Sequence, residues 1–189
     1  MNNIIYLFHS PGRSPKTSVN VVTIVLLLLF LAPVLSAGEK EITAAAVGDC
    51  VITRKISNSK APGLLKLVEL LRGADCTYGN CETTFFNPVN GYPAYKTHPD
   101  PHHYCLPFGA DEIGWAGIDL VSLANDHIMD FSYDGLSSTL SLLDRAGIAY
   151  AGAGKDLEHA AGPGYFDSGG GTVSLISCTS FFEMHSPAS

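Results

Sequence analysis

The sequence predicts an α/β fold in which mainly parallel strands are layered against helices. Short apolar segments alternate with segments whose leucines recur at helical spacing, and short links join them. Hydrophobic residues make up 46% of the chain and charged residues 15%, which favours a globular domain with a buried core and argues against a disordered chain. The 189 residues suffice for one domain of ordinary size with a short appendage.

The appendage is the N-terminal segment, residues 1–37. A cationic lead precedes an uncharged apolar stretch, residues 19–35, which small residues follow. This order is typical of a secretory signal peptide that is cleaved after Ala37, and the alternative is an uncleaved N-terminal membrane anchor. We therefore expect residues 38–189 to be exported to the cell envelope, either extracellular or anchored to the membrane.

Helices are expected where apolar residues recur every three or four positions. Residues 63–74 and residues 133–148 both have this spacing, and each segment has a glycine near its end that would stop the helix. Ser132 is placed to cap the start of the second helix. Another helix is expected to end within residues 111–118.

Strands are expected in the short apolar segments between the helices. The first of them is small and apolar, ends in Gly-Asp and is expected to be buried. A stretch rich in proline, glycine, asparagine and histidine, residues 85–105, is expected to form a surface loop. The expected strands lie within residues 42–49, 74–84, 119–125, 148–154 and 172–179.

Charge and cysteine content restrict the function. The net charge is −7 and no cluster of lysine and arginine is present, so binding to nucleic acid is excluded from the expected functions. Five cysteines follow residue 37, and with an odd number at least one cysteine has no disulfide partner within the chain. Cys76 and Cys81 could close a small loop. We expect one disulfide at most, with the other cysteines buried as small apolar residues.

Acidic residues follow three of the expected strands. Asp49, Glu82 and Asp126 take these positions, and His127 comes directly after the last of them. Because ligand sites of α/β folds lie at the carboxyl ends of the strands, these side chains are expected to converge. Converging carboxylates repel one another unless a cation or a proton neutralises them, which favours one divalent metal or a pair. Helix capping by the aspartates, with Glu82 solvated, is the simpler alternative.

Three further histidines, His98, His102 and His103, lie close together within residues 85–105. They offer no helical pair at i and i+4, and prolines keep the segment irregular. A surface loop near the substrate is therefore favoured over a metal site.

The residues at the strand ends resemble the CapA family of capsule and poly-γ-glutamate synthesis proteins. The segments AAVGDC, GNCETT, ANDH with the block that follows it, and GGTVSLIS are similar to successive blocks of that family, over residues 42–180. The family is related to calcineurin-like metallophosphoesterases. The resemblance implies a four-layer α/β/β/α sandwich with a site for divalent Mn, Fe or Zn ions, dinuclear in a complete chain.

The resemblance also implies roles for individual residues. Asp126 stands where the family commonly has asparagine, which keeps an oxygen ligand and adds a negative charge. The implied roles are metal ligation by Asp49, Glu82 and Asp126 and protonation of a leaving group by His127, with Asn80 and Asn125 as the candidates for substrate binding.

The function that the resemblance implies is that of an exported, metal-dependent, phosphoesterase-like protein of capsule or poly-γ-glutamate synthesis. An anionic polymer or a phosphoester is the expected substrate, and membrane subunits of polymer synthesis are the expected partners. Further histidine-containing blocks of the family have no counterpart here, so residues 38–189 are expected to be a partial domain, truncated at the C-terminus. The alternatives are a non-catalytic, membrane-anchored scaffold subunit of a polymer synthesis or export complex, and an inactive fragment.

Overall fold

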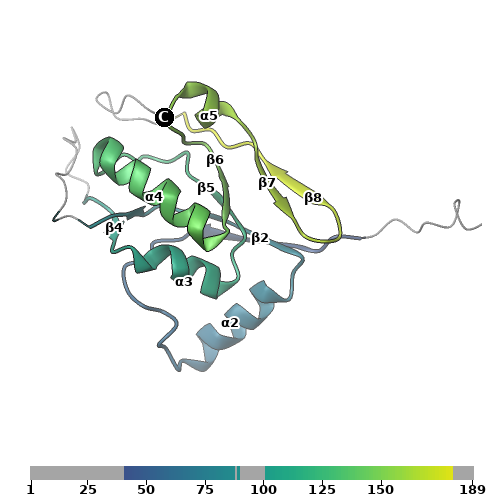
Figure 1. Cartoon of the computed structure of the whole chain (residues 1–189). Helices are drawn as coiled ribbons and strands as arrows, with labels where there is room; N and C mark the ends of the chain where they lie inside the picture. Colours follow the sequence, from purple (N-terminus) through teal and green to yellow (C-terminus); the bar gives the residue numbers. More distant parts are fainter. Residues whose placement is uncertain (1–40, 88, 90–100, 181–189) are drawn as a thin grey trace, which may run out of the picture. The chain divides into compact units, whose positions relative to one another are not determined.

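Four parallel strands form the main sheet of the protein (Figure 1). The computed structural model describes residues 41–87, 89 and 101–180. The strands of this sheet, in spatial order, are β1 (Ala44–Asp49), β2 (Cys76–Asn80), β5 (Leu120–Ser122) and β6 (Ala149–Ala151). Asn80 pairs with Asp49 on one side and with Ser122 on the other, so the carboxyl ends of the first three strands lie at one edge. The predicted parallel α/β arrangement is confirmed.

Helices connect the strands as the sequence predicts. The helices of the described chain are α2 (Pro62–Arg72), α3 (Phe108–Ala116), α4 (Ser132–Ala146) and α5 (Leu157–Ala161). Gly117 and Gly147 end α3 and α4 with φ angles of 84° and 71°, a left-handed conformation that favours glycine. The predicted cap at Ser132 is wrong, because Ser132 is the first helical residue and Phe131, at the N-cap, makes no capping side-chain bond.

The core lies between the main sheet and the helices, with α3 packed against both α2 and α4. Side chains of strand, helix and loop meet there, and Phe85, Ile113, Val121, Leu123 and Leu143 are fully buried. Thr139 of α4 links this core to the backbone near the site: its hydroxyl accepts a hydrogen bond of 2.9 Å from the N–H of Phe85.

The first strand is less buried than predicted. No residue of β1 is buried, and four of its six residues are exposed. The reason is its position, since β1 lies at the edge of the sheet and pairs only with β2. Small alanine side chains therefore mark a sheet edge here, where the sequence had suggested a buried strand.

The segment predicted as a surface loop has structured ends. Its first residues belong to β3 (Thr84–Phe85), its last to β4 (Tyr104–Cys105), and the two strands pair in parallel. Phe85 and Phe86 are buried at 0% and 4% exposure, so the loop prediction is wrong at both ends. Residues 88 and 90–100, which include His98, lie outside the described residues.

The last predicted strand belongs to a hairpin rather than to the parallel sheet. β8 (Thr172–Leu175) pairs antiparallel with β7 (Gly164–Asp167), a strand that the sequence analysis missed. Within the described ranges, no helix is long and apolar enough to cross a membrane. The predicted signal peptide or anchor, residues 1–37, lies outside those ranges.

All five cysteines are free thiols, so the small-loop disulfide between Cys76 and Cys81 is not formed. Four of them are buried, as expected for small apolar side chains, and Cys178 is exposed. Burial raises the pKa of Cys50 and of Cys105 to about 11 and that of Cys81 to about 12. These thiols therefore stay protonated and weakly nucleophilic at neutral pH.

We expect one thiol to react rapidly with a disulfide reagent in the native protein near pH 8, and five to react in guanidinium chloride. Cys178 should supply the rapid thiol because it is exposed, and Cys178→Ser should abolish that phase. The measurement is a stopped-flow thiol titration without reductant. Fewer than five reactive thiols in the unfolded protein would reveal a disulfide. Several rapidly reacting thiols in the native protein would contradict the burial of the other four cysteines.

Candidate metal centre

Three predicted site residues lie together beyond the carboxyl ends of β2 and β5. Glu82, Asp126 and His127 each offer one ligand atom, and these atoms all lie within 4.8 Å of one another. His127 Nε2 is 3.7 Å from Asp126 Oδ2. The imidazole is buried and the two carboxylates are half-buried. We call Glu82, Asp126 and His127 the acidic cluster.

Asp49, the fourth predicted site residue, is not part of the acidic cluster. It ends β1, is exposed, and its Oδ1 accepts a 2.8 Å hydrogen bond from Asn80 Nδ2. Asp49 nevertheless acts on the cluster electrostatically. Burial raises the pKa of Glu82 above its usual value, and the charges of Asp49 and then of Asp126 raise it further, while His127 and His103 oppose the rise. The carboxylates are therefore crowded enough for a cation to stabilise them.

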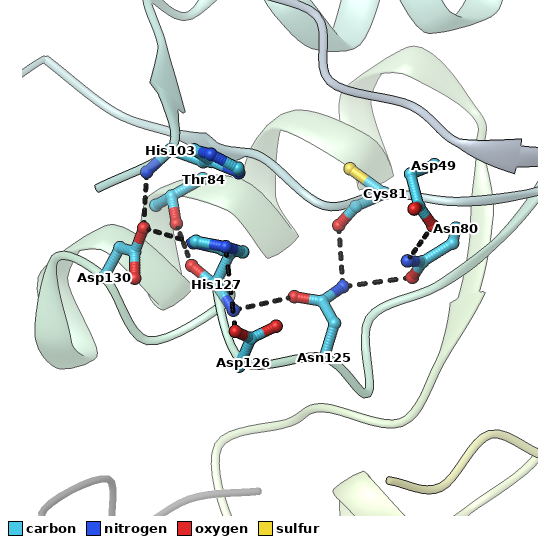
Figure 2. Close-up of polar contacts among 9 residues, drawn as sticks. All are labelled: Asp49, Asn80, Cys81, Thr84, His103, Asn125, Asp126, His127 and Asp130. Carbon is cyan, nitrogen blue, oxygen red and sulfur yellow. Dashed lines mark hydrogen bonds and ion pairs between the residues drawn. The ribbon is translucent and has the colours of Figure 1, made fainter. Parts of the chain in front are cut away.

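The two predicted amides are engaged in hydrogen bonds within the chain (Figure 2). Asn125 Nδ2 donates to Asn80 Oδ1 at 3.1 Å and to the carbonyl of Cys81 at 3.0 Å. Asn125 Oδ1 accepts from the backbone N–H of His127 at 3.1 Å. These bonds tie the end of β2 to the turn after β5, so both amides position the acidic cluster. Substrate binding by Asn80 and Asn125 stays a prediction.

A residue that the sequence analysis did not single out orients the imidazole. Asp130 is fully buried, and its Oδ2 lies 2.9 Å from His127 Nδ1. A carboxylate accepts here from Nδ1–H, which leaves Nε2 on the side of Asp126. The hydroxyl of Thr84 holds the backbone of the same histidine by donating to its carbonyl at 2.8 Å. An acidic residue three positions after His127 was the one signal that could have revealed this contact.

His103 also belongs to this site. Its ring stacks on the ring of His127, with centroids 3.7 Å apart and planes inclined by 14°. Its backbone N–H donates to Asp130 Oδ2 at 2.5 Å. Figure 2 shows the two parallel rings beside Asp130. The sequence predicted a surface loop near the substrate for this histidine but gave it no place in the site.

The sequence of the whole described domain matches a known family. Residues 43–189 match the family described as bacterial capsule synthesis protein PGA_cap. The chain belongs to this family. This result confirms the resemblance to capsule synthesis proteins of the CapA kind that the strand-end residues showed.

The curated relatives of this chain are longer than the region they share with it. The uncharacterized proteins y4sH and y4uA of Sinorhizobium fredii are each 36% identical to it over 145 residues, which is 75% of this chain and 31% of each relative. A probable polyglutamine synthesis accessory protein of Mycobacterium tuberculosis is 56% identical over 36 residues, 19% of this chain and 10% of that protein. The chain thus spans about a third of the length of its Sinorhizobium relatives.

Asn125→Asp is expected to lower the free energy of unfolding of the protein by about 1–3 kcal/mol. A carboxylate cannot donate to Asn80 and to the Cys81 carbonyl, and it would face both acceptors at close range. Urea unfolding followed by circular dichroism measures the change. Asn58→Asp is the matched control, since it adds the same charge at an exposed asparagine. Equal urea midpoints of unfolding for the two variants would contradict the positioning role of Asn125.

Proposed function

We propose that this protein is an exported, metal-dependent, phosphoesterase-like protein that acts in capsule or poly-γ-glutamate synthesis. The convergence of Glu82, Asp126 and His127 within 4.8 Å carries the proposal. Membership of the capsule synthesis family supports the pathway, as does the short match to a probable polyglutamine synthesis accessory protein. An anionic polymer or phosphoester as substrate, and membrane subunits of polymer synthesis as partners at the cell envelope, are parts of the same proposal.

The four-layer sandwich of the metallophosphoesterases is the proposed architecture of the complete protein. The strands of the parallel sheet are connected by helices along the chain. This arrangement is consistent with one half of such a sandwich.

The donor set of the acidic cluster fits a divalent metal. The two carboxylates offer oxygen ligands to Mn²⁺, Fe²⁺ or Zn²⁺, and the imidazole of His127 is left to hold a proton. Glu82 and Asp126 would hold the ion, and Asp49 is near enough to raise the pKa of Glu82 and so to add to the negative potential there. A bound ion supplies Lewis acidity toward a phosphoryl oxygen and a water of lowered pKa.

His127 would hold and deliver the proton at Nε2. Its Nδ1 faces Asp130, so the ring cannot turn without losing a hydrogen bond to a buried carboxylate. Asn125 and Thr84 hold the backbone of the same residue. The chain thus fixes the imidazole on the side of the cluster, where a leaving oxygen of a bound phosphoester would receive the proton.

Glu82→Ala and Asp126→Ala are each expected to weaken Mn²⁺ binding by at least about tenfold, because each removes a carboxylate ligand. Isothermal titration calorimetry on the 189-residue chain measures the affinity. Glu69→Ala, which removes an exposed acid of α2, is the matched control and should bind Mn²⁺ as the wild type does. A wild-type chain that binds neither Mn²⁺ nor Zn²⁺ would refute the metal site, as would an equal loss in the control.

His127→Ala is expected to lower kcat for bis(4-nitrophenyl) phosphate about 10²- to 10⁴-fold while the Kd for Mn²⁺ changes by less than about threefold. Steady-state kinetics and calorimetry on the same samples separate the two effects. His159→Ala, at an exposed imidazole on α5, is the control and should leave both quantities unchanged.

Two results would count against this assignment. A loss of Mn²⁺ affinity as large as that of Glu82→Ala would make His127 a metal ligand rather than the proton donor. A wild-type chain that binds metal yet hydrolyses no phosphoester would favour the non-catalytic scaffold.

A further inference from the structure

His103 is held in place from two directions. Its carbonyl accepts a 3.0 Å hydrogen bond from the N–H of Thr84, where β3 and β4 pair. Its own N–H donates to the buried carboxylate of Asp130. Asp130 therefore holds the backbone of His103 and the ring of His127 at the same time.

The ring of His103 has a polar atom that the described chain does not satisfy. Its Nδ1 is buried and finds no hydrogen-bond partner among the described residues. Such atoms are uncommon in folded proteins, so the surroundings of this ring lack one polar partner. The imidazole also lies within the field of the acidic cluster, since His103 is one of the groups that lower the pKa of Glu82.

A cleft begins at His103. Its volume is about 410 Å³, in the range of small-ligand sites. Tyr104 and Leu106, at 42% and 45% exposure, supply apolar surface along it. The described residues that line the cleft are Thr53, His102, His103, Tyr104, Cys105, Leu106 and Phe108.

The charge of the cleft complements an anion. None of the described residues that line it is acidic, although the chain as a whole carries a net charge of −7. Two lining residues are histidines, and Lys55 Nζ lies 5.5 Å from the ring centroid of Phe108. Imidazole and apolar side chains therefore line the cleft, and the ammonium group of Lys55 lies beside Phe108.

We infer that His103 contacts the phosphoryl group of the substrate and that the adjoining cleft receives an apolar or aromatic group attached to it. The inference rests on the proposed function, because the anion recognised is that of a phosphoester. It adds a specificity: the site prefers phosphoesters with an apolar or aromatic substituent over small hydrophilic ones. An imidazole N–H donates well to phosphate oxygens, and the apolar wall gains by being covered.

Binding of two phosphonates to the Zn²⁺-loaded chain tests this inference without turnover. Phenylphosphonate and methylphosphonate carry the same anionic group and differ in the apolar substituent. The wild type is expected to bind phenylphosphonate about tenfold tighter. His103→Ala should weaken both ligands about tenfold, because it removes a contact that they share. Leu106→Ser should reduce mainly the preference for the phenyl group, and His159→Ala should change neither affinity.

The outcomes separate the inference from the proposed function. Equal affinities for the two phosphonates in the wild type, or wild-type affinities in His103→Ala, would overturn the inference even if phosphoesters are hydrolysed. The expected pattern in a chain that hydrolyses no phosphoester would support the binding site and refute the phosphoesterase. If His103→Ala does not fold, by circular dichroism, Leu106→Ser decides alone, since it alters an exposed side chain.

Discussion

The contact between Asp130 and His127 is the interaction on which the rest of the site depends. A fully buried carboxylate is costly unless it is paired or hydrogen-bonded. Asp130 meets this requirement by binding His127 Nδ1 and the backbone N–H of His103 with the same oxygen. One buried side chain therefore fixes the turn after β5, the backbone that leads into β4 and the orientation of the His127 imidazole.

Sheet register supplies the second constraint. In a parallel sheet the carboxyl ends of neighbouring strands meet at one edge, and here Asp49, Asn80 and Ser122 occupy paired positions at that edge. Hydrogen bonds run from Asp49 through Asn80 and Asn125 to the backbone of His127. This series of hydrogen bonds from β1 to the backbone of His127 depends on the strand register. A register shift of one residue would break it.

Local patterns predicted the parts of the fold that local chemistry determines. Helical spacing and terminal glycines located α2 and α4, and polar residues after strands located Glu82, Asp126 and His127. Contacts between distant segments were beyond such patterns: the buried pairing of β3 with β4 and the stacking of His103 depend on a loop of about twenty residues closing on itself. The exposure of β1 was missed for the same reason, because a strand's place in a sheet is a tertiary property.

Asp126 increases the negative charge of the acidic cluster. Asp126, which stands where the resembled family commonly has asparagine, adds a charge beside Glu82 and contributes to the raised pKa of that residue. The same carboxylate lies 3.7 Å from His127 Nε2, so it contacts both of the other members of the cluster. In the proposed metal site, a divalent ion would relieve the repulsion between the two carboxylates. An asparagine at position 126, with no charge, would repel Glu82 less, so the aspartate strengthens the need of this cluster for a neutralising cation.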